Sequence, residues 1–385
     1  MSHLKIVKLE LFKVPPRWLF LKITTDSGIS GWGEPVLEGK TDSVAAAVRD
    51  MEEYLIGRDA SRIEDIFNVL SKGGFYRGGV LMMSAISGIE QALWDIKGKY
   101  LNTPVYNLLG GAVRDKIRIY GWVGGDEPDE LAAQAALRMK AGYTAIKMNA
   151  CGRMEWIVTP AEAKKVRKRL EELRTAVGDA IGIGIDFHGR VHKSAAKMLV
   201  RELEAFSPMF YEEPLLPEFS DQIKSIASST TVPLAMGERL VGRREFRRLI
   251  EEGVVDIIQP DISHAGGIWE TRKIAAMAEA SDIALAPHCP LGPIAFAASL
   301  HINACSPNAI IQESSQGIHY NEGVDMLDYL TNKDDFTVKA GFVPLPQGPG
   351  LGVEIDEVFL KEMTKVGHNW RNPIWRGEDG GFIEW

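Results

Sequence analysis

From about residue 116 onward, short apolar runs alternate with longer amphipathic stretches. The eight runs are KIRIYGWV, YTAIKMNA, GIGIDFH, MFYEEP, PLAMGE, VDIIQPD, ALAPHC and AIIQE. Each run has the length of a buried strand, and each is followed by a stretch long enough for a helix. Strands that alternate with helices predict parallel βαβ units, and eight such units can close into a barrel. We therefore expect an α/β fold with a TIM-type (β/α) barrel over residues 116–340.

Residues 1–115 follow a different pattern, in which strands precede helices. We expect strands at residues 4–14, 17–25 and 29–35, and helices at about 42–57, 61–70 and 82–100. The turn signal Asp26-Ser27-Gly28 separates two of these strands, as in an antiparallel meander. This order predicts an α+β domain with its own small core.

The rival architecture is a doubly wound open sheet. It is less favoured, because no glycine-rich nucleotide turn follows the first strand of either region. The string GPGLG at 348–352 is not framed by a strand and a helix, so we interpret it as a turn. Residues 341–385 are rich in Gly, Pro and Trp, and we expect them to pack back onto the N-terminal domain.

The composition limits the partners of the chain. Its net charge of -8 argues against nucleic-acid binding, which requires a basic surface, although a local cation can still bind an anionic substrate. Three widely spaced cysteines form no CxxC pair, which favours a reducing, cytoplasmic compartment. The N-terminus lacks the apolar region of a signal peptide, and residues 283–302 contain too many His and Pro for a membrane span. We also expect a homo-oligomer.

Polar side chains recur near the ends of the last six expected strands. They are Asp186, Glu212, Glu238, Asp261, His288 and Glu313. Successive gaps of 26, 26, 23, 27 and 25 residues each equal about one βα unit. Because the C-terminal strand ends of a barrel open onto one face, we expect these side chains to converge on one pocket.

The first three of these residues predict a metal site. A single carboxylate at a strand end is often only a helix cap, but Asp186, Glu212 and Glu238 lie on three adjacent strands. Carboxylates brought together repel one another and require a cation. An all-oxygen site favours Mg²⁺ over Zn²⁺. Glu213 is expected on the opposite side of its strand, in a supporting contact.

Two histidines accompany the carboxylates. His188 shares a strand face with Asp186, and His288 ends the strand next to the one that ends in Asp261. An isolated core histidine is usually structural, but a neighbouring carboxylate orients the ring and raises its basicity. Such a pair suits removal of a proton next to a substrate carboxylate, and the second histidine can protonate a leaving hydroxyl.

Further inward-facing groups complete the expected pocket. Glu313 faces the metal across the barrel and could hydrogen-bond a developing oxyanion if protonated. Lys147 and Asn149 share the inward face of the second strand. Lys147 is a candidate for holding a carboxylate oxygen of the substrate, and its alternative is a surface lysine at a strand end.

The chain resembles the enolase superfamily, in its mandelate racemase-like subgroup, over its whole length. The strings that carry the resemblance are VPPRWLFLKI, GWGEPVLEG, GGFYRGG, GIEQALWDIKGK, LLGGAVRDK, DFHGRVH, EEP, GER, QPDISHAGG, LAPHCPLGPIA, QES to GIHYN, and NWRNPIWR. Each string alone is weak, but their order and spacing together are specific.

The resemblance implies an N-terminal α+β capping domain over a modified barrel, and an Mg²⁺-dependent dehydratase of a sugar acid. The implied magnesium ligands are Asp186, Glu212 and Glu238; the general base is His288, assisted by Asp261; the general acid is His188; and Glu313 stabilises the enediolate. Enzymes of this superfamily use a Lys or His base together with Mg²⁺.

One departure from the subgroup concerns the second strand. Racemases of the subgroup resemble one another in a Lys-x-Lys there, whose second lysine is a base, whereas this chain has Lys147-Met148-Asn149. The missing base favours one-base elimination over racemisation, and Asn149 is expected to contact a substrate hydroxyl.

The substrate implied by the resemblance is D-galactonate, converted to 2-dehydro-3-deoxy-D-galactonate and water. D-gluconate and D-mannonate are the alternatives. We expect specificity to come from the loops of the capping domain, through Arg17, Trp18, Tyr76 and Arg77. A non-catalytic relative of the barrel enzymes is disfavoured because every expected position is filled. A nicotinamide oxidoreductase is disfavoured because a dinucleotide fingerprint is missing.

Overall fold

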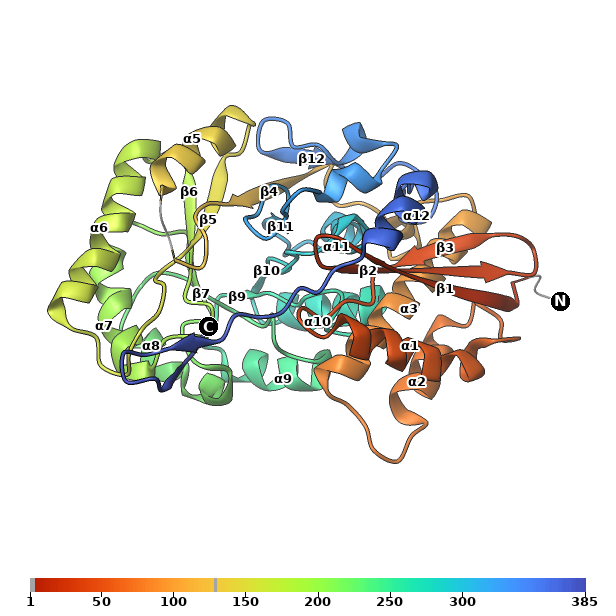
Figure 1. Cartoon of the computed structure of the whole chain (residues 1–385), viewed down its shortest axis with the longest axis horizontal. Helices are drawn as coiled ribbons and strands as arrows, with labels where there is room; N and C mark the ends of the chain where they lie inside the picture. Colours follow the sequence, from red (N-terminus) through yellow and green to blue (C-terminus); the bar gives the residue numbers. More distant parts are fainter. Residues whose placement is uncertain (1–3, 128–129) are drawn as a thin grey trace.

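The computed structural model describes residues 4–127 and 130–385. The N-terminal domain consists of a three-stranded antiparallel sheet and three main helices, as expected from the sequence (Figure 1). Its elements are β1 (Ile6–Val14), β2 (Trp18–Thr25), β3 (Ser30–Gly33), α1 (Thr41–Leu55), α2 (Ile63–Lys72) and α3 (Val80–Tyr100). A short helix, α4 (Val105–Leu108), leads into the barrel.

Glycines allow β3 to pack directly against α3. A Cβ atom added to Gly33 would lie 1.8 Å from the carbonyl oxygen of Gly88, and one added to Gly31 would lie 2.2 Å from that of Ala92. Since real side chains never approach so closely, the GWGEP string and the glycine of GIEQALW are required for this contact.

All eight expected barrel strands are present. They are β4 (Lys116–Trp122), β5 (Ala145–Asn149), β6 (Gly182–Asp186), β7 (Phe210–Glu212), β8 (Leu234–Met236), β9 (Ile257–Ile258), β10 (Ala284–Leu285) and β11 (Gln312–Ser314). They form one parallel path in the order β10-β9-β8-β7-β6-β5-β4-β11. An isolated parallel bridge links Leu285 of β10 to Ala309, in the segment that leads into β11 at the other end of the path. The α/β barrel with an N-terminal α+β domain is thus confirmed.

The helices between the strands depart from the expected pattern at two places. The helices are α5 (Leu131–Lys140), α6 (Pro160–Val177), α7 (Lys193–Glu204), α8 (Lys224–Ala227), α9 (Gly242–Glu252), α10 (Gly267–Glu279) and α11 (Pro293–Cys305). After β7 the chain forms only the 3-10 turn η1 (Pro217–Gln222) and the four-residue α8. After β11 it forms only η2 (Met326–Tyr329) and η3 (Lys333–Phe336). The expectation of a full helix after every strand was wrong there, because Pro217 and the polar, glycine-containing segment 315–325 favour turns.

Residues 341–385 contact both parts of the molecule. The segment begins with β12 (Phe342–Pro344), which pairs antiparallel with β4. Helix α12 (Glu357–Val366) then packs against β1. From there the chain crosses to the barrel, where β13 (Trp375–Arg376) and β14 (Phe382–Ile383) form a small hairpin (Figure 1, dark blue).

Two buried carboxylates join the N-terminal domain to the barrel. Glu34 accepts hydrogen bonds from the backbone N–H groups of Gly292 and Ala295, at the start of α11. Glu90 on α3 accepts those of Ile268 and Trp269, at the start of α10. Each carboxylate meets the positive end of a helix dipole, where the first N–H groups have no partner within the helix.

None of the helices in residues 4–127 and 130–385 has both the length and the apolar character that a membrane span requires.

Candidate active site

Three buried carboxylates converge at the C-terminal ends of neighbouring barrel strands. Asp186 ends β6, Glu212 ends β7, and Glu238 follows β8 by two residues. One oxygen atom of each lies within 4.8 Å of the others. Asp186 Oδ2 and Glu238 Oε2 are buried and have no hydrogen-bond partner among the described residues. Buried carboxylate oxygens without donors fit a hard cation such as Mg²⁺.

The charges of this cluster are partly balanced by Lys147 of β5. Its side chain is fully buried, and Nζ contacts Glu212 and lies 3.0 Å from Glu313 Oε1 and 3.7 Å from Asp186 Oδ2. Burial alone would lower the pKa of Lys147, but Glu212 and Glu313 outweigh it and raise the pKa well above its usual value. The inward orientation expected for Lys147 is therefore found, and its alternative as a surface lysine is wrong.

Burial also affects the carboxylates themselves. It raises the pKa of Asp186 to about 6, against the attraction of Lys147. Glu212 is held on its other side by Gln259, whose Nε2 donates to Glu212 Oε2 at 2.7 Å. Gln259 lies two residues before Asp261 in the QPD string and was not among the expected site residues. Glu213 points away, as expected, and accepts the N–H of Gly237 at 2.8 Å.

His288 and Asp261 form a hydrogen-bonded pair. His288 Nδ1 lies 2.8 Å from Asp261 Oδ2, while Nε2 lies 3.4 Å from Glu238 Oε2 and 3.9 Å from Glu313 Oε2. Burial disfavours the charged ring, but Glu238, Glu313 and Asp261 together raise the pKa of His288 well above its ordinary value. The second oxygen of Asp261 accepts the backbone N–H of Ser263 at 2.7 Å.

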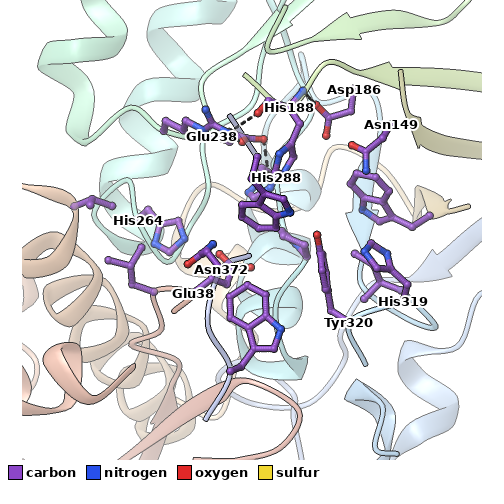
Figure 2. A pocket seen from close by; sticks show the side chains of 18 residues that line it. Glu38, Asn149, Asp186, His188, Glu238, His264, His288, His319, Tyr320 and Asn372 are labelled. Atoms are coloured by element: carbon purple, nitrogen blue, oxygen red, sulfur yellow. Dashed lines mark hydrogen bonds and ion pairs between the residues drawn. The ribbon is translucent and has the colours of Figure 1, made fainter. Parts of the chain in front are cut away.

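The second histidine, His188, lies beside Asp186 (Figure 2). Its backbone N–H donates to Asp186 Oδ1 at 2.6 Å, and its φ of 55° is in the left-handed region that non-glycine residues seldom adopt. Burial, and then the charges of Arg190 and Arg239, hold the pKa of His188 well below its usual value. The two histidines thus experience opposite electrostatic environments.

Glu313 and Asn149 complete the inner wall. Glu313 Oε1 accepts from the indole of Trp122 at 2.6 Å, and Oε2 accepts from the backbone N–H of Cys289 at 2.7 Å. Both oxygens thus accept a hydrogen bond from the protein, and the hypothesis that a protonated Glu313 donates to a developing oxyanion stays a prediction. Asn149 donates to the carbonyl of Gly125, and its Oδ1 has no partner among the described residues.

A cavity of about 360 Å³ opens above these groups. In the view of Figure 2, Asp186, His188, Glu238 and His288 are grouped at one end, and His319 and Tyr320 lie at the other. The cavity is lined by Leu37, Glu38, Val80, Trp122, Asn149, Asp186, His188, Glu238, Arg239, His264, His288, Pro290, Ile318, His319, Tyr320, Trp370, Asn372 and Trp385. Its walls therefore combine barrel loops, the N-terminal domain and the tail.

The four residues expected to bind substrate from the N-terminal domain do not line this cavity. Arg17 is buried behind the wall, where it contacts Glu38 and the carbonyl of Pro290. Trp18 is a core residue stacked on Phe20. Tyr76 and Arg77 border a different cavity, between α2, α3 and α9, and Tyr76 is 93% exposed.

Several lining residues had no signal in the strand spacing. Trp370, Asn372 and Trp385 come from the tail, and the ring of Trp385 lies 5.2 Å from that of His188. His319 follows β11 in a loop, and neither ring nitrogen has a hydrogen-bond partner within the described part of the chain. The tail tryptophans and the NWRNPIWR string were visible in the sequence, but nothing in them indicated this position.

Comparison with known proteins identifies the family. Residues 15–110 match the mandelate racemase/muconate lactonizing enzyme N-terminal domain, and residues 130–358 match the enolase C-terminal domain-like family. The chain therefore belongs to the mandelate racemase/muconate lactonizing enzyme family of the enolase superfamily, which confirms the resemblance.

Individual relatives cover nearly the whole chain. It is 52% identical over 382 residues to the D-galactonate dehydratase of Ralstonia pickettii, covering 99% of this chain and 100% of the relative. The D-galactonate dehydratase of Pectobacterium atrosepticum is 52% identical over 383 residues, with the same coverage.

Solved structures have the same architecture. An enolase from Agrobacterium radiobacter with bound Na and L-malate is 33% identical, with a TM-score of 0.88, and the alignment covers 99% of this chain and 100% of that one. A member of the enolase superfamily from Salmonella Typhimurium is 31% identical, with a TM-score of 0.85 and coverage of 93% and 98%.

Proposed function

We propose that this chain is a Mg²⁺-dependent hydro-lyase that converts D-galactonate to 2-dehydro-3-deoxy-D-galactonate and water. The observation that carries the proposal is the cluster of Asp186, Glu212 and Glu238 together with two histidines. His188 donates its N–H to Asp186, and His288, paired with Asp261, has Nε2 3.4 Å from Glu238 Oε2. The D-galactonate dehydratases that are 52% identical over the full length support the same reaction. L-Malate, bound by the Agrobacterium radiobacter relative, is itself a 2-hydroxy acid, like an aldonate.

Asp186, Glu212 and Glu238 are the groups that would hold the metal. When bound there, Mg²⁺ supplies positive charge to the substrate carboxylate, which makes the neighbouring C2–H more acidic. Lys147 adds a fixed positive charge at the same end of the cavity, 3.0 Å from Glu313. The preference for Mg²⁺ over Zn²⁺ rests on the all-carboxylate donor set.

His288 removes the C2 proton in this proposal. Its Nδ1 is engaged by Asp261 at 2.8 Å, so Nε2 is the nitrogen that meets the substrate. Asp261 holds the ring in that orientation and stabilises the imidazolium that forms.

His188 donates a hydrogen to the 3-hydroxyl as the C3–O bond breaks. Asn149 occupies the position where the racemases of the subgroup carry a second base, and its free Oδ1 can accept a hydrogen bond from a substrate hydroxyl. With a histidine base on one face only, elimination is favoured over racemisation.

Kinetics with a series of sugar acids test the substrate. A wrong epimer leaves a buried polar group unpaired, at about 1–3 kcal/mol, so one mismatch corresponds to about 5- to 150-fold and two to about 30-fold or more. With Mg²⁺ present, we expect kcat/KM for D-galactonate to be at least about tenfold above the values for D-gluconate and D-mannonate. The measurement is formation of the 2-keto-3-deoxy product. An equal or higher value for D-gluconate would refute the substrate and leave the mechanism intact.

A further inference from the structure

Arg190 contacts His188 directly and has no part in the chemistry described above. Its side chain is 1% exposed, and its Nη2 lies 2.8 Å from His188 Nδ1. A guanidinium group only donates hydrogen bonds, and it remains charged throughout the pH range of proteins. His188 Nδ1 is therefore the acceptor, and the ring hydrogen is carried by Nε2.

Arg190 is itself fixed by three separate segments. Its Nη1 donates to the carbonyl oxygens of Asp126, after β4, at 3.0 Å and of Cys151, after β5, at 3.3 Å. Asp126 Oδ1 lies 3.5 Å from Nη2 and accepts the hydroxyl of Tyr320 at 2.5 Å. The guanidinium also lies 4.9 Å from the centre of the Trp375 ring. The direction from which Arg190 meets His188 is thus set by the fold.

The backbone of His188 is held as firmly as its Nδ1. Its N–H donates to Asp186 Oδ1 at 2.6 Å, and its carbonyl accepts from Arg239 Nη2 at 2.7 Å. With both backbone groups and Nδ1 engaged, Nε2 is the polar atom of His188 left for a ligand in the cavity that the residue lines.

We propose that Arg190 is a positioning residue for the dehydration step, because it fixes the tautomer and the orientation in which His188 presents Nε2–H to the leaving hydroxyl. The inference rests on the proposed function. As the C3–O bond breaks, its electron pair remains on oxygen, the Nε2 hydrogen passes to that oxygen, and water leaves. The electrons of the former C2–H bond form the C2=C3 double bond. The neutral His188 ring thereby becomes an imidazolate anion, whose negative charge faces the guanidinium of Arg190 until a proton from solvent returns to Nε2.

Arg190 acts on the acid His188 and not on the base His288. Without Arg190, the ring can carry its hydrogen on Nδ1 and turn a lone pair toward the leaving hydroxyl, which then departs unassisted. The His288–Asp261 pair makes no contact with Arg190, so removal of the C2 proton is expected to continue. A structural role for Arg190 would instead weaken both steps together.

The first test compares two variants in the Mg²⁺-loaded enzyme. In Arg190→Met, we expect dehydration of D-galactonate to fall by about 100-fold or more, while exchange of the C2 proton with solvent deuterium remains near the wild-type rate. A 3-deoxy-3-fluoro substrate should recover much of the loss, because fluoride leaves without a proton. Arg153→Met is the matched control, since Arg153 is half exposed and its guanidinium lies 5.9 Å from the centre of the same Trp375 ring. Parallel loss of exchange and dehydration in Arg190→Met would overturn the proposal.

The second test uses no Arg190 variant, so it does not depend on whether such a variant folds. In ¹⁵N-histidine-labelled wild-type protein, the signal that disappears in His188→Asn should show a protonated Nε2 and an unprotonated Nδ1 at neutral pH. The opposite tautomer, or a doubly protonated ring, would exclude Arg190 as the group that fixes His188. The tautomer of His188 is measured without substrate, whereas the proposed function is tested by turnover of D-galactonate in the wild-type enzyme. Failure of one proposal can therefore be distinguished from failure of the other.

Discussion

Replacing Asp261 by asparagine tests how the His288 base is oriented. Asp261 accepts two hydrogen bonds, from the backbone N–H of Ser263 at Oδ1 and from His288 Nδ1 at Oδ2. An asparagine keeps its oxygen toward Ser263, because that N–H has to be paired, and so directs its NH2 group at His288. The NH2 group donates to Nδ1, which moves the ring hydrogen to Nε2 and blocks the nitrogen that takes the C2 proton.

The size of the expected loss of activity in Asp261→Asn follows from the same contacts. Turning the amide over would restore the acceptor for His288 but leave the Ser263 N–H unpaired, at a cost of about 1–3 kcal/mol. That cost corresponds to a factor of about 5 to about 150 in the population of the active orientation. Loss of the negative charge beside the forming imidazolium adds to it, and the corresponding Asp→Asn change in a serine protease lowers kcat by about 10⁴. We therefore expect kcat/KM to fall by about 10²–10⁴ in Asp261→Asn.

The assay measures dehydration and C2 deuterium exchange in parallel, and both should fall together because the base acts in both. Asp256→Asn is the control: Asp256 also accepts a backbone N–H, that of Leu234 at 2.8 Å, but at the opposite end of β9. Its activity should match wild type. An Asp261→Asn enzyme that retains most of its exchange activity would refute the assignment of His288 as the base.

Two further predictions concern the metal and the stability of the fold. Chelation should abolish activity and Mg²⁺ should restore it; full activity in excess chelator would contradict this. Glu212→Gln should weaken Mg²⁺ binding, measured by calorimetry, by at least about 10–100-fold, which is the loss typical when a residue that only contacts a metal ligand is changed. His301 is buried in α11 with a pKa lowered to about 4 by burial, so the unfolded chain takes up a proton that the folded chain excludes as the pH falls from about 6.5 to about 4. The folded protein therefore keeps its full free energy of unfolding above this pH window and loses part of it as the pH falls through the window. Denaturant titrations should show that His301→Gln reduces this dependence on pH, by up to about 1.4 kcal/mol per pH unit. An equal dependence of the free energy of unfolding on pH in the two proteins would contradict the prediction.

The strand-end residues could be predicted from the sequence because barrel geometry converts a regular spacing into a common location. Each βα unit of about 25 residues returns the chain to the same face, and so Asp186, Glu212 and Glu238 meet although they are separated in sequence. His288 and Asp261 were expected as neighbours for the same reason, since β9 and β10 are adjacent in the sheet.

The outer wall of the cavity follows no such rule. Trp385 reaches His188 across almost 200 positions of sequence, and Arg190 reaches Asp126 through a loop, so neither contact has a periodic signal. Arg17 was expected in the pocket because an arginine in a capping-domain loop can hydrogen-bond substrate hydroxyls, but it is buried against Glu38. Sequence patterns report which face of an element is buried; they do not report which loop covers a cavity.

The two carboxylates that join the N-terminal domain to the barrel limit how a substrate can enter. If that domain swung away as a rigid body, Glu34 and Glu90 would leave the helix starts they bind, and four backbone hydrogen bonds worth about 0.5–1.5 kcal/mol each would be lost. Together these losses oppose a hinge that opens in every catalytic cycle. Entry and release therefore depend on local movements of the cavity rim, where the tail residues Trp370 and Trp385 lie. The rate of product release should accordingly respond to changes in the tail and not to changes that tighten the contact between the two domains.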